Sequence, residues 1–282
     1  MCIQENTLRR MGETDMNKVY CCYPGGKHKA LTMSYDDGKQ EDLRLVEIFN
    51  RYGIKGTFHI NSGLIGLDEQ RLRPACFREL YAGHEVACHT VTHPTIARCP
   101  IASVAQEMIN DRVALEKTMG YPVRGLSYPN GSLSDEIKRL LPMCGIRYAR
   151  VVGSSDSFAL PEDPYAWQAT CHHNHRLMEL GEQFLQLKKR QYLYLMYVWG
   201  HSFEFTLQNN WDLIEGFCKM MGGQDDIWYC TNIELMDCLD QFARLQFAAD
   251  NSFVHNPNAA DCWISVNDQA PICIPGGATV ML

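Results

Sequence analysis

Two carboxylates stand side by side in the segment Ser34-Tyr35-Asp36-Asp37-Gly38, directly after a short apolar run. Adjacent negative charges repel each other unless a cation or a proton lies between them. Asp36 and Asp37 are therefore candidates for a metal site or for acid/base chemistry. The same pair could instead cap a helix in the loop that follows a strand. The two residues by themselves leave both interpretations open.

Two histidines four positions apart, His89 and His93, form a second candidate site. In a turn, this spacing can place both imidazoles on one metal ion. Pro94 restricts His93 to an extended backbone, so we expect a loop and not the long helix of an HExxH protease. Two ordinary polar loop residues would give the same pattern, so this pair is also undecided when taken alone.

Two further segments that could carry catalytic residues lie at the ends of apolar runs. The sequence Tyr128-Pro129-Asn130-Gly131 by itself indicates only a tight turn. The sequence Trp199-Gly200-His201-Ser202 ends the most apolar run of the chain. A histidine there could act as an acid or a base, because its ordinary pKa lies near neutrality. Taken alone, His201 is more simply explained as a core histidine.

These segments follow strands in a repeated strand–helix pattern. Short apolar runs alternate with segments of helical periodicity, and Gly53, Gly83 and Gly120 mark helix ends. The predicted strands are 31–35, 56–61, 84–89, 123–128, 146–151, 192–199 and 227–230. Seven such units predict a parallel sheet that closes into a barrel. In parallel barrels the site lies at the carboxyl ends of the strands, where all four segments fall.

The two ends of the chain differ from this pattern. Residues 1–17 carry charges throughout and are expected to form a poorly ordered tail. Residues 249–282 contain short apolar runs separated by turn sequences, which predicts a small β element. The expected organisation is a tail, a barrel domain over 18–248 and a C-terminal β extension. That extension could pack on the barrel or against another chain, so a homo-oligomer is left open.

Taken together and in this order, the aspartate pair, the histidine pair before a proline, the Pro-x-Gly turn and the strand-end histidine resemble the polysaccharide deacetylase family. Its members carry the NodB homology domain of carbohydrate esterase family 4. The resemblance covers about residues 29–248. It implies a distorted (β/α)7 barrel, which agrees with the separate count of seven strand–helix units. It also implies a hydrolase that removes the N-acetyl group of an amino sugar or short oligosaccharide.

The resemblance implies roles for the residues that match the family's motifs. Asp37, His89 and His93 match the ligands of one divalent metal, usually zinc, with cobalt, nickel or manganese as other candidates. Three protein ligands leave a metal open to water and to a carbonyl oxygen, which suits hydrolysis of an amide. Asp36 matches the general base, and His201 matches the general acid that protonates the departing nitrogen.

Three residues are candidates for holding the substrate. The resemblance implies that the backbone N–H of Asn130 helps to hold the oxyanion. Tyr128 belongs to the same turn. Trp167 lies in the segment that replaces the family's fourth motif, where it could form a wall on which a sugar stacks. A surface-loop position is the more frequent alternative for Trp167.

The chain departs from the family pattern at two places. Many members carry an arginine that braces the base, but the matching position here is Ser127. The fourth motif is not clearly present, and Asp163 and Glu204 are the candidates for bracing His201. Three nearby histidines are more simply explained as a polar loop than as a second metal site: His172, His173 and His175.

Composition narrows the partners and the compartment. The net charge of −7 argues against a nucleic-acid-binding protein, which needs a basic surface. It also gives no reason to expect binding to a membrane surface. The 13 cysteines include no CxxC pair, which favours reduced thiols in a cytoplasm. The sequence shows no signal-peptide core and no run of about 18 apolar residues. We therefore expect a cytoplasmic protein that acts on a soluble, short carbohydrate.

Two other functions remain open at this point. The same machinery would suit an amidase that acts on an amide outside a sugar. A catalytically inactive, sugar-binding barrel is disfavoured, because the chain keeps a residue at each expected metal-ligand, base and acid position.

Overall fold

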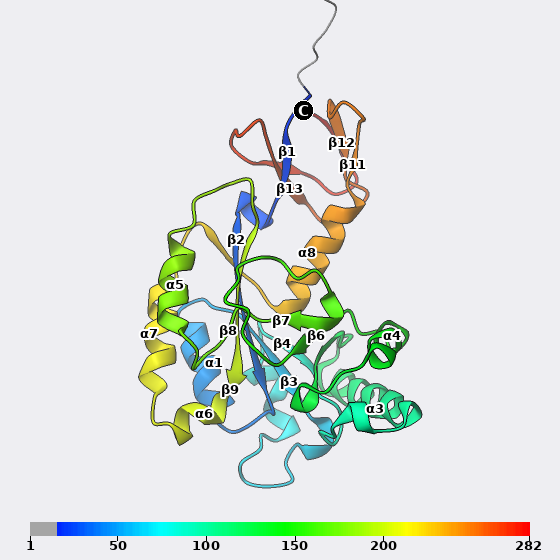
Figure 1. The fold of residues 1–282 in the computed structure, drawn as a ribbon, viewed down its shortest axis with the longest axis vertical. Helices are drawn as coiled ribbons and strands as arrows, with labels where there is room; N and C mark the ends of the chain where they lie inside the picture. Colours follow the sequence, from blue (N-terminus) through cyan, green and yellow to red (C-terminus); the bar gives the residue numbers. More distant parts are fainter. Residues whose placement is uncertain (1–15) are drawn as a thin grey trace, which may run out of the picture. The chain divides into compact units, whose positions relative to one another are not determined.

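The computed structural model describes residues 16–282, so most of the expected tail, residues 1–17, lies outside the described chain. These residues form two compact units (Figure 1): a barrel unit of residues 27–240, and a β unit of residues 16–26 together with 241–282. We expected the barrel domain to span 18–248. The difference at the N-terminal side arises because the first strand pairs with a C-terminal strand of the β unit.

The barrel unit is built, within its described residues, on one curled sheet of nine strands that pair in parallel. Its strands run in the order β7-β6-β5-β4-β3-β2-β9-β8, and β10 also pairs with β2. Their bounds are β2 Lys29–Asp36, β3 Gly56–Ile60, β4 Glu85–Cys88, β5 Gly125–Ser127, β6 Tyr148–Val151, β7 Trp167–Gln168, β8 Cys171–His172, β9 Tyr194–His201 and β10 Ile227–Tyr229. The predicted parallel α/β barrel is confirmed as a curled sheet with β7 and β8 at its ends.

Helices cover the sheet, and strands β2, β3 and β4 are buried along their whole length. Figure 1 shows α1, α5, α6 and α7 gathered at one side of the sheet and α3 with α4 at the other. The helices are α1 Asp42–Arg51, α2 Phe77–Leu80, α3 Ile101–Met119, α4 Asp135–Met143, α5 Leu177–Leu185, α6 Ser202–Leu207, α7 Trp211–Met221 and α8 Asn232–Arg244. In α1, Leu45, Ile48 and Phe49 form the buried face at helical spacing.

The structure shifts several predicted boundaries. The run predicted as strand 192–199 becomes β9, which extends to His201, so the candidate acid is the last residue of the strand. The two-residue strands β7 and β8 were not predicted, because such short pairings leave no periodic pattern. Ser134 caps α4, because its Oγ accepts the N–H of Ile137 at 3.3 Å.

The β unit contains two small antiparallel sheets. One is formed by β1 Val19–Cys22, β13 Cys262–Val266 and β14 Ile272–Ile274, and the other by β11 Gln246–Phe247, β12 Phe253–His255 and β15 Thr279–Met281. Its core consists of Leu245, Val254, Cys262, Ile264 and Ile274. The predicted C-terminal β element is confirmed, since β12, β13, β14 and β15 all lie within residues 249–282.

Candidate active site

The predicted catalytic residues meet at the carboxyl ends of neighbouring parallel strands. Asp36 is the last residue of β2 and His201 the last residue of β9, and the two are direct partners in the strand register. His59 of β3 is the partner of Asp36 on the other side. Because parallel strands end at one edge of the sheet, residues far apart in the sequence lie together there.

Asp37, His89 and His93 form a group that can hold a metal ion. Oδ1 of Asp37 lies 3.8 Å from Nε2 of His89 and 4.0 Å from Nε2 of His93. The ligand atoms of all three lie within 4.8 Å of one another. Bonds of about 2.0–2.2 Å allow two ligands of one ion to be at most about 4.2 Å apart, so both aspartate–histidine pairs can share an ion. One carboxylate and two imidazoles suit Zn²⁺ or a similar divalent metal.

The loops that carry these residues hold an unusual backbone conformation. Asp37, His93 and Asn130 have positive φ angles of 82°, 59° and 55°, although none is glycine, so the extended backbone predicted for His93 from Pro94 is wrong. Such conformations cost about 1–3 kcal/mol each and persist where the surroundings fix them, often at functional sites. At Asp37, the backbone N–H donates to the carbonyl of His59 at 2.9 Å, and Arg71 Nη1 donates to the Asp37 carbonyl at 2.8 Å.

His89 is oriented by two groups that the sequence did not reveal. Its Nδ1–H donates to the carbonyl of Ser127 at 2.8 Å, which leaves Nε2 directed at Asp37 with its lone pair. Its backbone N–H donates to Oδ2 of Asp111 at 3.0 Å. Oδ1 of this buried α3 carboxylate accepts the N–H of Ser62 at 2.8 Å. Burial raises the pKa of Asp111 to about 7. The sequence contained one sign of this role, because Asp111 lies on the apolar face of a predicted helix.

Asp36 is held by an arginine from an unexpected position. Nη2 of Arg150, on β6, donates to Oδ2 of Asp36, and Ser127 Oγ donates to the same oxygen at 3.1 Å. Ser127 and Arg150 are direct partners in the register of β5 and β6. Arg150 on the adjacent strand therefore supplies the bracing cation that the chain lacks at position 127, where it carries Ser127. The sequence contained one sign of this interaction. Arg150 lies within a predicted apolar strand, and a buried arginine needs a partner.

The surroundings keep Asp36 ionised. Burial would raise its pKa, but the Arg150 guanidinium and the nearby imidazoles outweigh that effect and hold the pKa far below its usual range. Arg150 is itself fully buried and stacks on the ring of Trp199, with 4.4 Å between Cζ and the ring centroid. The other carboxylate oxygen, Oδ1, is buried and makes no hydrogen bond with the described residues, so it can receive a proton from a bound molecule.

His201 pairs with Glu204, one of its two candidate braces. Oε1 of Glu204 lies 3.2 Å from Nδ1 of His201. Burial lowers the pKa of His201, but Glu204 and the charges of Asp36 and Asp37 raise it more, so the net pKa is above its ordinary value. The other candidate, Asp163, bonds instead to the N–H of Tyr165 at 2.8 Å and to Nζ of Lys138 at 3.1 Å. Asp163 is therefore not the brace.

The three substrate-binding candidates are placed differently. Trp167 is 1% exposed and meets Tyr148 and Tyr197 edge to face, so it belongs to the core and offers no wall for a sugar. Pairing of β7 with β6 turns its ring inward. Tyr128 is also buried, and its hydroxyl donates to the carbonyl of Tyr165 at 2.7 Å. Asn130 lies at the surface of its turn, with Nδ2 3.2 Å from Thr95 Oγ1.

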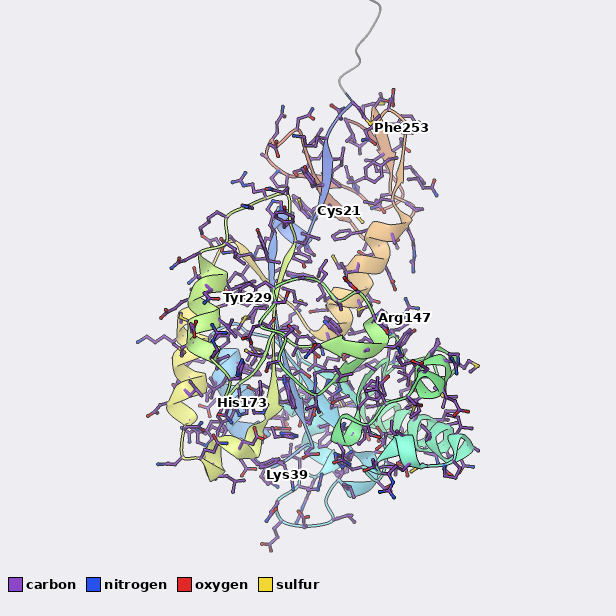
Figure 2. All side chains as sticks on the ribbon, viewed as in Figure 1. Cys21, Lys39, Arg147, His173, Tyr229 and Phe253 are labelled. Carbon is purple, nitrogen blue, oxygen red and sulfur yellow. The ribbon has the colours of Figure 1, made fainter. Side chains whose placement is uncertain are left out.

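A cleft of about 550 Å³ opens beside the metal-ligand candidate Asp37. It combines charged, amide and apolar side chains, which is a lining suited to a polar ligand with apolar faces. Figure 2 shows Lys39, one of its residues, just beyond the end of β2. The lining residues are Asp37, Lys39, Gln40, Glu41, Glu69, Gln70, Arg71, Phe203 and Leu207.

The chain is similar to known polysaccharide deacetylases. Residues 23–149 match the family model described as polysaccharide deacetylase. The peptidoglycan-N-acetylmuramic acid deacetylase PdaC of Bacillus subtilis is 23% identical over 41% of this chain and 24% of its own length. A chitooligosaccharide deacetylase from Bradyrhizobium is 26% identical over 29% and 36%. The chain thus spans about a quarter to a third of these relatives.

Solved structures share the fold. A protein from Mycobacterium smegmatis assigned to the polysaccharide deacetylases superposes with a TM-score of 0.60 at 16% identity, over 78% of this chain and 93% of its own. A family 4 carbohydrate esterase from Streptomyces lividans gives 0.51 at 14% identity, over 71% and 91%. The predicted resemblance to the polysaccharide deacetylase family is confirmed. Among the described residues, no helix is long and apolar enough to cross a membrane.

Proposed function

We propose that this chain is a metal-dependent deacetylase that hydrolyses the N-acetyl group of an amino sugar or short oligosaccharide. The observation that carries the proposal is the convergence, at one edge of the sheet, of the Asp37-His89-His93 group with Asp36 and His201. The named activities of the two curated relatives, on peptidoglycan N-acetylmuramic acid and on chitooligosaccharide, support a carbohydrate substrate.

The metal would be held by Asp37, His89 and His93. When bound, a divalent ion of this kind acts as a Lewis acid on a carbonyl oxygen and lowers the pKa of water. The protein supplies the proton transfers. Asp36, kept ionised by Arg150, accepts a proton from the attacking water through its unpaired Oδ1.

His201 is the complementary acid. Its raised pKa favours the imidazolium form, and Glu204 holds Nδ1, so Nε2 is the nitrogen that can donate to the departing amine. The opposite shifts at Asp36 and His201 suit one proton acceptor and one proton donor in the same site. The backbone N–H of Asn130 is the proposed donor to the oxyanion.

The cleft beside Asp37 supports a sugar as the substrate. Its amide and charged side chains can bond hydroxyl groups, and Phe203 adds an aromatic surface. We propose that the residues of a short oligosaccharide next to the reacting one lie there.

Acetate release tests the function directly. The zinc-loaded protein should release acetate from N-acetylated hexosamine oligosaccharides faster than from simple amides or from insoluble chitin and peptidoglycan. Preference for the simple amides would point to the amidase alternative. Binding of these sugars without any acetate release would point to an inactive barrel.

A further inference from the structure

A second cluster of metal-binding side chains surrounds Glu204. Its Oε2 lies 3.0 Å from Nε2 of His172 and 3.0 Å from Nε2 of His173, and its Oε1 lies 3.2 Å from Nδ1 of His201. The ligand atoms of His172, His201 and Glu204 all lie within 4.8 Å of one another. Two imidazoles and one carboxylate are a ligand set that divalent transition metals favour.

The fold brings these three residues together without using any member of the Asp37-His89-His93 group. His172 ends β8, where it is the register partner of Trp199 on β9. His201 ends β9, and α6 begins at the next residue, so Glu204 follows by less than one helical turn. The side chains of His172, Glu204 and His201 are 20%, 21% and 25% exposed, so an ion from solvent can reach them.

His173 is an independent sign that this cluster is built to receive a cation. Its ring is fully buried and stacks against the rings of Phe205 and Tyr35, with centroid distances of 4.1 Å and 5.8 Å. A Cβ at Gly200 would lie 2.0 Å from its Nδ1, so only glycine permits this packing. Figure 2 shows His173 beside β9. Its Nε2 faces Glu204 Oε2, yet neither ring nitrogen makes a well-formed hydrogen bond with the described residues.

We propose that His172, Glu204 and His201 bind a second divalent cation, of which Zn²⁺ is the probe we would use, and that this cation inhibits the deacetylase. The inhibition rests on the proposed function. His201 would bind the ion through Nδ1, the nitrogen that now faces Glu204. The ion replaces the proton on Nδ1, which passes to solvent, so His201 is no longer the imidazolium that donates to the departing amine.

Metal stoichiometry tests the site without any activity. Metal-free protein is titrated with Zn²⁺ by calorimetry, and zinc is then measured by elemental analysis. We expect two equivalents for the wild type and for His175→Ala, a control whose histidine pairs with Asp156 outside the cluster. We expect one equivalent for His172→Ala and for His172→Gln, and one for Asp37→Ala, which removes the other site.

Circular dichroism of each variant distinguishes loss of a metal site from loss of the fold. If His172→Ala fails to fold, His172→Gln serves in its place, because it keeps a polar side chain. A wild type that takes one equivalent, or folded His172 variants that still take two, would overturn the site.

Acetate release then tests the inhibition. Activity of the wild type should rise to the first equivalent of Zn²⁺ and fall by about 10²-fold or more at the second, the scale of losing a positioned acid. The His172 variants should show the rise without the fall. A wild type that binds two equivalents with no fall would overturn the inhibition. If every protein is inactive at one equivalent, the proposed function fails, while the stoichiometry still decides the site.

Discussion

The guanidinium of Arg150, on β6, holds the carboxylate of Asp36, on β2, across 114 positions of sequence. The two strands are not neighbours in the sheet, and the long side chain of Arg150 passes Ser127 and Ser34 to reach its partner. Both charges are buried, so each depends on the other for stability as well as for its state of ionisation.

Replacing Arg150 should therefore destabilise the protein. Arg150→Met would leave the Asp36 charge buried and unpaired, which costs about 3–5 kcal/mol. The free energy of unfolding, measured with urea, checks this. Arg147→Met is the matched control, because that arginine pairs with Asp240 at the surface and should change stability little. Equal losses for the two variants would contradict the pairing.

The same variant should move the acidic limb of the pH–activity profile. Arg150 lowers the pKa of Asp36, so the base stays ionised to low pH. Without the cation the pKa rises, the base becomes protonated at a higher pH, and activity is lost there. The profile of kcat/KM reports this shift. An unmoved acidic limb would remove either Asp36 as base or Arg150 as its brace.

Asp36→Asn should lower kcat about 10²-fold or more, the scale of a positioned general base. Asn fills a similar volume but cannot accept the proton. Zinc content should stay unchanged, because the proposed ligands are Asp37, His89 and His93. Normal turnover would exclude Asp36 from the mechanism.

Asp37→Ala should abolish tight metal binding at the proposed catalytic site. Removing the carboxylate leaves two imidazoles, too few to hold the ion against solvent exchange. Elemental analysis after dialysis against one equivalent of Zn²⁺ checks this in a His172→Ala background, which lacks the second proposed site, with Asp163→Ala as a control carboxylate outside the cluster. Equal zinc content with and without the Asp37→Ala change in that background would refute the assignment.

Asp111→Ala should weaken zinc binding about 10–100-fold, although Asp111 is not a proposed ligand. Its carboxylate fixes the backbone N–H of His89, and loss of that bond frees the loop that carries the imidazole. Competition with a zinc chelator measures the affinity. An unchanged affinity in a folded variant would show that the carbonyl groups of Ser127 and Ile60 are enough to orient His89.

Glu204→Gln should move the basic limb of the profile to lower pH. The pKa of His201 is raised in part by Glu204, and the acid is protonated only below that pKa. With a neutral amide the pKa falls, so the donating form is lost earlier as pH rises. The kcat profile checks this, and Asp163→Asn should leave it unmoved.

Much of the site could be predicted from the sequence, because the chemistry lies in short local motifs at strand ends. Asp36-Asp37, His89, His93 and His201 follow strands whose apolar runs mark where they end, and parallel strands end at one edge. The parallel direction of the strands followed from the same alternation of apolar runs and helical periodicity, which predicted seven of the nine strands of the sheet and missed β7 and β8.

Only the tertiary structure decided which side chains support these residues. Arg150 and Asp111 reach the site through strand register and a helix packed on the sheet, and neither belongs to a local motif. For His201 the sequence offered two candidate braces, and the structure places Glu204, and not Asp163, beside it. Trp167 shows the converse, since its sequence context suggested a sugar wall but the pairing of β7 buries it. Register and packing depend on contacts between distant residues, which spacing along the chain does not encode.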